Sequence, residues 1–371
     1  MPRETVPGER RVALVPEAVA KLTSAGTEVV VESGAGTGSG HDDESYRTAG
    51  ASVADRNAAF GADLVVKVQK PSADEIALLT EGAALIATLQ PLTNADTVRA
   101  LAAKRTTAIS MDAIPRVTRA QAMDSLSSQS NIAGYKAVVV AASSLPKFFP
   151  MLTTAAGTVT PARVLVLGAG VAGLQAIATA RRLGAVVEAF DTRPVVKEQV
   201  QSLGAKFLEI DLGEQGEGTG GYAKELSEEA HRKEQELVGK HVKDADVVIT
   251  TALVPGRRAP ILVTADMIKA MRPGSVIVDL AAEMGGNAEL TVPGETVVRE
   301  GVTIHGEVNW PSTVSIHASQ LYSRNVGALL GLLIKDGALV LDRDDEIVKG
   351  ALITDQGEIV HAATKDRLEK A

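Results

Sequence analysis

The sequence has no cysteine in its 371 residues. Disulfide bonds and thiolate metal sites are therefore excluded as sources of stability or chemistry. Aromatic residues make up only 3% of the chain, although 45% of it is hydrophobic. The apolar interior must then be built from alanine, valine, leucine and isoleucine, which suits parallel sheets covered by helices on both faces. These two scarcities predict an α/β protein.

An excess of positive charge is also missing, since the formal net charge is −8 and the pI is about 5.4. We therefore expect no nucleic-acid partner and no direct lipid binding. The longest uncharged run, residues 164 to 180, contains three glycines and falls just short of a membrane-spanning helix. No charged-then-apolar segment precedes the first motif, so we expect that the chain is not secreted.

Apolar runs of strand length alternate along the chain with helix-like segments. The first series of expected strands is 28–33, 63–68, 84–89 and 106–111. The second series is 163–168, 186–191, 246–252, 275–281 and 302–307. Long helices are expected at 127–145, ending before Pro146, and at 318–334.

This alternation predicts two Rossmann-like lobes joined by long helices. We expect a first α/β lobe in residues 1–126 that is completed by residues 320–371. Residues 127–319 are expected to form the second lobe, a doubly wound dinucleotide-binding domain with the connecting helices. The cleft between two such lobes is the default place for a binding site.

The sharpest motif is RVLVLGAGVAGLQAIATARRLGAVVEAFDTR, residues 163–193. Gly168, Gly170 and Gly173 form G-x-G-x-x-G between an expected strand and an expected helix, and Asp191 ends the next strand. The glycines permit a tight turn, a close approach of pyrophosphate and tight packing of the helix on the strand. Asp191 can accept a hydrogen bond from a ribose 2′-hydroxyl but would repel a 2′-phosphate, which favours NAD(H) over NADP(H). The positive charge of Arg193 works against that preference. The alternative is a glycine turn that serves packing alone.

A second glycine-rich stretch, SGAGTGSG at 33–40, has Ser39 where the third glycine of this pattern would fall. We expect it to be a flexible surface turn.

The segment PRVTRAQAMDSLSSQSN, residues 115–131, is unusually polar for this chain. Arg116 could reach a phosphate or carboxylate, Gln121 could bond to an amide or ribose, and Asp124 could fix either of them. These groups orient a ligand, and none is an obvious general acid or base. The alternative is a polar loop in which Asp124 or Ser125 caps the following helix.

Histidine is the usual acid or base beside a nicotinamide, and the chain has six. His305 and His317 flank the last strand of the second series and could face the cleft, although we favour a structural role. The other four are expected to be solvated: His41, His231, His241 and His361.

Four stretches together carry a family resemblance: residues 4–19, 116–135, 155–185 and 250–268. The chain resembles the NAD(H)-binding component, domain I, of proton-translocating NAD(P) transhydrogenase. Alanine dehydrogenase shares the fold and is the alternative, with Arg11 and Lys67 matching residues that there hold the substrate carboxylate and carbonyl. The sequence departs from that alternative at Gln90 and Pro91, where the dehydrogenases carry a catalytic histidine. It also departs from the family's usual opening strand, since Met1 directly precedes the Pro-Arg-Glu motif.

The resemblance implies a hydride passed directly between NAD(H) on this chain and NADP(H) on a partner domain. It assigns Gln121, Arg116 and Asp124 to catalysis, with Gln121 spanning the two nucleotides. It implies no metal. The residues that it places around NAD(H) are Arg116, Gln121, Asp124, Ser127, Tyr135, Gly168, Gly170, Val171, Gly173, Asp191, Arg193, Gly221, Gln235 and Leu253.

The resemblance also implies a homodimer that works with an NADP-binding domain and a membrane-spanning subunit. The chain would then be cytoplasmic and peripheral to the inner membrane, attached through these partners. Coupling to proton translocation would reside in the membrane subunit. A non-catalytic NAD-sensing module remains a third possibility, because a fold and a fingerprint do not establish chemistry.

Overall fold

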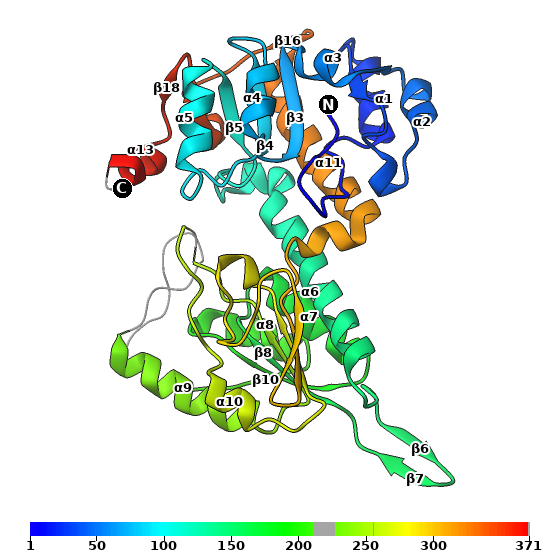
Figure 1. Cartoon of the computed structure of the whole chain (residues 1–371), viewed down its shortest axis with the longest axis vertical. Helices are drawn as coiled ribbons and strands as arrows, with labels where there is room; N and C mark the ends of the chain where they lie inside the picture. Colours follow the sequence, from blue (N-terminus) through cyan, green and yellow to red (C-terminus); the bar gives the residue numbers. More distant parts are fainter. Residues whose placement is uncertain (211–226, 255, 370–371) are drawn as a thin grey trace. The chain divides into compact units, whose positions relative to one another are not determined.

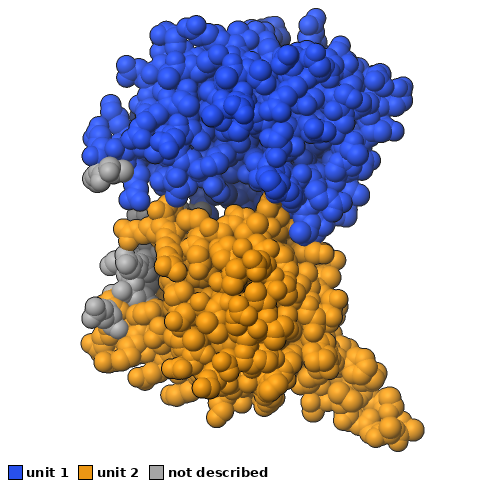
Figure 2. Space-filling view, in the orientation of Figure 1, with its two compact units in different colours: residues 1–129, 312–371 blue, residues 130–311 orange. Residues whose placement is uncertain are grey.

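Parallel β-sheets form where the sequence places its apolar runs, which confirms the expected α/β class. The computed structural model describes residues 1–210, 227–254 and 256–369. The chain divides into unit 1, residues 1–129 with 312–371, and unit 2, residues 130–311 (Figure 2). Helix α6 (Ser125–Ser144) begins in unit 1 and ends in unit 2.

Unit 1 contains a five-stranded sheet in the order β18-β17-β5-β4-β3 and a separate parallel pair, β1-β2. Strands β3, β4 and β5 are parallel, whereas β17, from the far end of the chain, pairs antiparallel with β5. The strands are β1 (Val30–Glu32), β2 (Ser52–Ala54), β3 (Leu64–Gln69), β4 (Ala84–Thr88), β5 (Thr107–Ser110), β15 (Ile334–Lys335), β16 (Ala338–Leu339), β17 (Leu352–Asp355) and β18 (Glu358–Ile359).

Helices and short 3₁₀ turns connect these strands, and the C-terminal helix α13 lies close to α5 (Figure 1). They are α1 (Pro16–Ser24), η1 (Thr37–Ser39), α2 (Asp43–Thr48), α3 (Arg56–Phe60), α4 (Ala73–Leu78), α5 (Ala95–Ala103), η2 (Thr118–Met123), α11 (Ser315–Leu333), α12 (Glu346–Ala351) and α13 (Ala362–Glu369). The 3₁₀ helix η6 (Trp310–Val314) crosses the boundary between the units. Helix α11 contributes a buried face that packs into the apolar core of unit 1.

Unit 2 contains a seven-stranded sheet in the order β10-β9-β8-β11-β12-β14-β13. All neighbouring strands are parallel except the edge strand β13, which pairs antiparallel with β14. The chain adds strands on one side of β8 first and then on the other side, as in a doubly wound dinucleotide-binding fold. The strands are β6 (Leu152–Thr154), β7 (Gly157–Val159), β8 (Arg163–Leu167), β9 (Val186–Phe190), β10 (Lys206–Phe207), β11 (Val247–Thr250), β12 (Val276–Asp279), β13 (Thr296–Arg299) and β14 (Val302–His305).

The helices of unit 2 pack their apolar faces against this sheet. The packed side chains form two clusters of buried hydrophobic residues. Besides the end of α6, its helices are α7 (Val171–Arg182), η3 (Pro194–Val196), α8 (Lys197–Ser202), α9 (Glu228–Val242), α10 (Ala265–Lys269) and η5 (Ala282–Met284). The β6-β7 hairpin extends away from the rest of the unit, and its residues are exposed (Figure 1).

The stretch at 33–40 is a turn at the surface, as expected, but two of its glycines are tightly packed. A side-chain carbon at Gly36 would lie 2.6 Å from the Tyr46 ring, and one at Gly38 would lie 2.8 Å from the Arg10 carbonyl oxygen. Tyr46 itself is fully buried and donates a hydrogen bond to the Leu14 carbonyl. These glycines serve close packing rather than ligand binding.

The first residues of unit 1 include charged side chains that are buried and paired with each other. Glu9 accepts three bonds from Arg11, through its backbone N–H, Nε and Nη2, at 2.7 to 2.9 Å. Gln69 Nε2 donates to the same carboxylate at 2.8 Å. Burial raises the pKa of Glu9, but the hydrogen bonds and charge of Arg11, together with the Gln69 amide, outweigh burial and lower the pKa to about 2.

A second buried cluster surrounds Lys67 on β3. Its ammonium lies 3.2 Å from a Glu4 oxygen and 3.4 Å from a Glu75 oxygen, and all three side chains are almost fully buried. The Glu4 carboxylate also accepts the Val68 backbone N–H at 2.6 Å. The start of the chain is thus tied to β3 by buried charge pairs, which are costly to break once formed.

The Gly134→Ala variant tests the packing of α6 on α7. A side-chain carbon at Gly134 would lie 2.1 Å from the Ala172 carbonyl oxygen, so the two helices must separate. We expect a loss of about 1–3 kcal/mol in the free energy of unfolding, measured by urea unfolding followed by circular dichroism. The matched control is Gly327→Ala in α11, where no atom lies within 4 Å. It should be neutral or stabilising by up to about 1 kcal/mol; equal losses would contradict the packing account.

The Glu9→Gln variant tests the buried pair with Arg11. Because the folded pKa of Glu9 is depressed, its contribution to stability is present above about pH 4.5 and is lost as the pH falls towards 2. We expect the variant to be about 3 kcal/mol less stable at neutral pH. The difference from wild type should shrink below pH 4.5 by up to about 1.4 kcal/mol per pH unit.

Urea unfolding between pH 7 and pH 3 measures this difference. The control is Glu44→Gln, at an exposed pair with Arg47, which should follow the wild type across the range. A constant difference between Glu9→Gln and wild type from pH 7 to pH 3 would contradict the assigned pair.

Candidate functional site

The glycine-rich turn of unit 2 joins the end of β8 to the start of α7. Gly168 has φ +99°, a conformation that side chains disfavour, and a side-chain carbon at Gly173 would lie 1.9 Å from the Gly168 carbonyl oxygen. Gly170 precedes α7, and the nearest atom to a side-chain carbon there is Arg193 Nη2 at 3.8 Å. Two glycines therefore shape the turn, and the middle one leaves room for a ligand to approach the backbone.

Helix α7 begins at Val171, so its first backbone N–H groups have no partner within the helix. Such an end carries partial positive charge and suits a phosphate group. The residues present thus fit the pyrophosphate of a dinucleotide.

Asp191 follows β9 and is tied to the same turn. Its Oδ2 accepts the Ala169 backbone N–H at 2.7 Å. Arg193 donates to both oxygens of the carboxylate, from Nε at 2.8 Å and Nη2 at 2.7 Å, and its backbone N–H donates at 2.9 Å. The side chains of Asp191 and Arg193 are 5% and 14% exposed. Asp191, the acid expected at the ribose, is therefore hydrogen-bonded to the glycine-rich turn and paired with Arg193.

The end of β11 also meets this turn. Thr251 Oγ1 donates to the Gly168 carbonyl oxygen at 3.0 Å. Leu253 follows two residues later and is 42% exposed. The carboxyl ends of β8, β9 and β11 thus bring these candidates to one edge of the sheet, where dinucleotides bind in this class of fold. Gly221 lies outside the described residues.

Helix α9 presents Gln235 and its neighbour Glu234. Glu234 is buried, and His231 Nδ1 lies 2.9 Å from its Oε2, while Gln235 Nε2 lies 3.2 Å from His231 Nε2. Burial raises the pKa of Glu234, and the Asp191 charge adds to this, although His231 opposes it. Sequence reasoning missed Glu234. The spacing Ala230, Glu234, Val238, Val242, all buried, would have placed it on the inner stripe of the helix.

The polar segment of unit 1 contains η2. Arg116 and Gln121 are exposed, whereas Asp124 is half-buried. Asp124 accepts the Ser127 backbone N–H at 2.9 Å and the Ser127 hydroxyl at 2.6 Å, and so caps the start of α6. Two of the expected ligand-binding residues therefore contact each other. Tyr135, ten residues into α6, is 45% exposed and belongs to unit 2.

Asn325 on α11 fixes the backbone of this segment. Its Nδ2 donates to the Ala122 carbonyl at 2.8 Å, and its Oδ1 accepts the Ser128 hydroxyl at 2.7 Å. The segment is thus held by partly buried hydrogen bonds, while Arg116 and Gln121 are exposed.

Gln90 is the second residue after β4 and has φ +48°, an uncommon conformation for a residue with a side chain. Asp112 Oδ1 supports it by accepting the backbone N–H groups of Leu89 and Gln90 at 3.0 and 3.2 Å. The backbone of Gln90 is therefore held in this conformation by the Asp112 carboxylate.

Three of the histidines contact carboxylates. His231 and His241 are partly buried and lie 2.9 Å and 2.8 Å from the carboxylates of Glu234 and Glu188. They are thus only partly exposed, at 38% and 23% of their side chains, rather than fully solvated as expected. His305 is buried, with Nε2 2.8 Å from Ser144 Oγ and Nδ1 3.0 Å from Glu307 Oε1, which is the structural role that we favoured.

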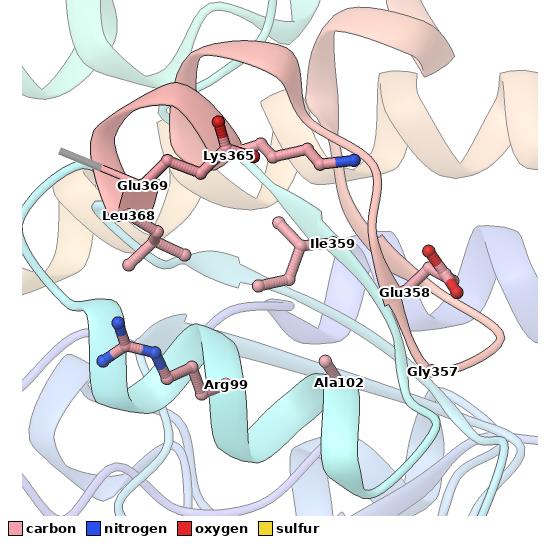
Figure 3. A pocket seen from close by; sticks show the side chains of 8 residues that line it. All are labelled: Arg99, Ala102, Gly357, Glu358, Ile359, Lys365, Leu368 and Glu369. Atoms are coloured by element: carbon pink, nitrogen blue, oxygen red, sulfur yellow. The ribbon is translucent and has the colours of Figure 1, made fainter.

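A cavity of about 490 Å³ lies elsewhere, in unit 1 (Figure 3). Figure 3 shows Arg99 and Ala102 on α5 facing Lys365 and Leu368 on α13, with Ile359 between them. It contains no residue of the glycine-rich turn or of the polar segment. Its polar lining is exposed, so we assign it no function.

Two absences hold for residues 1–210, 227–254 and 256–369. Within these ranges, no cluster of histidine, aspartate and glutamate has the geometry to hold a metal ion. No helix in these ranges is long and apolar enough to cross a membrane.

Comparison with known proteins agrees with this geometry. Residues 1–133 match the family described as "Alanine dehydrogenase/PNT, N-terminal domain", and residues 137–362 match its C-terminal domain. The chain is 50% identical over 374 aligned positions to an NAD(P) transhydrogenase alpha-subunit protein of Rhodospirillum rubrum, covering 98% of this chain and 97% of that protein.

Solved structures give the same result. The fold matches the crystal structure of transhydrogenase from Sinorhizobium meliloti with a TM-score of 0.86 and 45% identity, over 97% of this chain and 98% of the other. An L-alanine dehydrogenase matches with a TM-score of 0.83 and 28% identity, over 100% and 98% of the two chains. The two-domain family match and the higher identity to transhydrogenases together show that the chain belongs to the alanine dehydrogenase/PNT family and, within it, is a transhydrogenase component of the NAD(P) transhydrogenase alpha-subunit type.

Proposed function

We propose that unit 2 binds NAD(H) at the carboxyl edge of its sheet and that the chain passes a hydride directly between NAD(H) and NADP(H) on a partner domain. The observation that carries the proposal is the turn at Gly168–Gly173 with Asp191 hydrogen-bonded to it. The start of α7 would hold the pyrophosphate, and Asp191 would accept the ribose hydroxyls. NAD(H) supplies the hydride chemistry when it is bound.

The residues of the chain would then position and shield rather than exchange protons. Direct transfer needs the two reacting carbons at about 3–3.5 Å, with water excluded. Gln121 is exposed on η2, and we assign it the role of spanning the two nucleotides. Arg116 would meet a phosphate, and Asp124 with Ser127 would hold the segment in place. Tyr135, Val171, Arg193, Gly221, Gln235 and Leu253 complete the proposed binding set.

The alternative, an alanine dehydrogenase-like enzyme, requires a proton acceptor as well as a hydride acceptor. The side-chain amide of Gln90 cannot exchange a proton at neutral pH, yet it stands where that family carries a catalytic histidine. Transfer between two nicotinamide rings moves a hydride without this proton, which fits a glutamine at that position.

The proposed assembly follows from this chemistry. An NADP(H)-binding domain must supply the second ring, and coupling to proton translocation requires a membrane-spanning subunit. We propose that both are partner subunits, that the chain works as a homodimer, and that it is peripheral to the cytoplasmic face of the inner membrane through them.

Mixing the purified chain with an NADP-binding transhydrogenase domain tests the function. We expect hydride transfer from NADH to an oxidised NADP⁺ analogue in the mixture, followed by the absorbance of the reduced analogue. Neither component should catalyse it alone. L-alanine with NAD⁺ is the control substrate pair; reduction of NAD⁺ by alanine with this chain alone would establish the dehydrogenase alternative. Binding of NADH without transfer in any mixture would indicate a sensing module.

Gln121→Asn tests the bridging role within the same assay. Shortening this side chain by one methylene withdraws its amide by more than about 1 Å, so we expect transfer to fall at least about tenfold. Binding of NADH should change far less, because the nucleotide is held mainly by unit 2. Gln199→Asn on α8, also an exposed glutamine, is the matched control and should be unchanged. Unchanged transfer in Gln121→Asn would remove that residue from the mechanism.

A further inference from the structure

The side chain of Asn287, in the segment after η5, is fully buried and bonds to the backbone that follows β11. Its Oδ1 accepts the Ala252 backbone N–H at 3.0 Å, and its Nδ2 donates to the Ala252 carbonyl at 2.9 Å. Nδ2 also donates to the Pro260 carbonyl at 2.8 Å. A single amide therefore satisfies both backbone groups of Ala252 and ties them to a residue further along the chain.

Asp279, the last residue of β12, fixes Asn287 in turn. Its Oδ2 accepts the backbone N–H groups of Asn287 and Ala288 at 2.8 and 3.0 Å and the Thr291 hydroxyl at 2.7 Å. Its Oδ1 accepts the Thr250 hydroxyl at 2.9 Å, which joins β12 to the end of β11. Asp279 is fully buried, like Asn287. A buried polar network with its groups satisfied in this way specifies one arrangement of the elements that it joins.

Ala252 lies where the segment after β11 meets the glycine-rich turn. Its backbone nitrogen is 3.4 Å from the position of a side-chain carbon at Gly168. Thr251, the residue before it, donates to the Gly168 carbonyl oxygen. Leu253, the residue after it, is 42% exposed and belongs to the proposed binding set. Asn287 thus holds the residue that links the turn to an exposed apolar side chain.

We propose that Asn287 is a positioning residue for NAD(H) and that it acts through Leu253. The inference rests on the proposed NAD(H) site and adds the residue that prepares its apolar contact. Because both backbone groups of Ala252 are bonded, the direction in which the chain enters Leu253 is set before the nucleotide binds. Such preorganisation reduces the ordering that binding would otherwise require. Asn287 is buried, so its effect on the nucleotide is indirect.

Two single variants and their combination test whether these residues act together. Asn287→Ala releases Ala252, so Leu253 must be ordered on binding, and we expect the dissociation constant for NADH to rise about tenfold. Leu253→Ala removes the apolar contact and should raise the constant by a similar factor. In the double variant the constant should rise no further than in the more affected single variant, because each change acts on the same contact. Independent effects would multiply to about a hundredfold.

Calorimetric titration of NADH into the full chain measures these constants, and urea unfolding followed by circular dichroism measures the stability of each variant. Leu253→Ala changes a partly exposed side chain, so it tests the proposal even if Asn287→Ala does not fold. Its matched control is Leu183→Ala at the end of α7, where the leucine is 39% exposed. The control for lost stability is Val302→Ala, which opens a cavity at a fully buried position of β14. Both controls should leave the constant for NADH unchanged.

The outcomes separate this inference from the function on which it rests. Unchanged NADH binding in Leu253→Ala, multiplied effects in the double variant, or equal weakening in Val302→Ala and Asn287→Ala would overturn the positioning role while leaving the NAD(H) site intact. Failure of the wild-type chain to bind NADH would instead overturn the proposed function, and this inference with it.

Discussion

Close backbone contact on both sides of α7 is the constraint on which the proposed site depends. Gly173 fits against the Gly168 carbonyl, and Gly134 on α6 fits against the Ala172 carbonyl, each at a separation that excludes a side chain. Helix α7 is therefore fixed at its first turn by contacts that only glycine permits. The turn that leads into this helix is also tied to Asp191, whose carboxylate accepts the Ala169 backbone N–H. Packing thus sets the position of the helix end that we propose as the phosphate site.

The local sequence was sufficient to predict much of unit 2. Its buried parallel strands are continuous apolar runs, so RVLVLG and SVIVDLA identified β8 and β12 to within two residues. The glycine spacing predicted the turn because each glycine answers a steric demand of that backbone. The same reasoning failed for β13 and the β6-β7 hairpin. These are exposed edge elements whose residues carry little hydrophobic signal.

The ion pairs could not be predicted in the same way. Asp191 and Arg193 are two residues apart in a loop. Nothing in the sequence indicates that Nε and Nη2 of the arginine both donate to this carboxylate. Glu234 was hidden in a helix rich in charge, although its spacing from buried neighbours marked the inner face. The contacts of Asp124, in contrast, could be predicted. The sequence offered helix capping as one role for this residue, and Asp124 accepts the Ser127 N–H and hydroxyl at the start of α6. Side-chain partners depend on tertiary geometry, which periodicity does not contain.

The chemistry proposed here needs few reactive groups, and the polar residues at both candidate regions suit positioning. Gln90 is held in an unusual conformation by Asp112, and Gln121 is exposed on a segment whose backbone Asn325 anchors. Neither glutamine titrates near neutral pH, which is consistent with a hydride passing between two rings and no proton passing with it.

The most direct test of this account is the fate of the hydrogen itself. NADH carrying deuterium at the transferred position of C4 would be mixed with the chain, an NADP-binding transhydrogenase domain and an oxidised NADP⁺ analogue, and the reduced product examined by mass spectrometry. Direct transfer predicts that each molecule of product formed carries one deuterium. Product without deuterium, with the label found in water, would contradict direct transfer and require an exchangeable carrier between the two nucleotides.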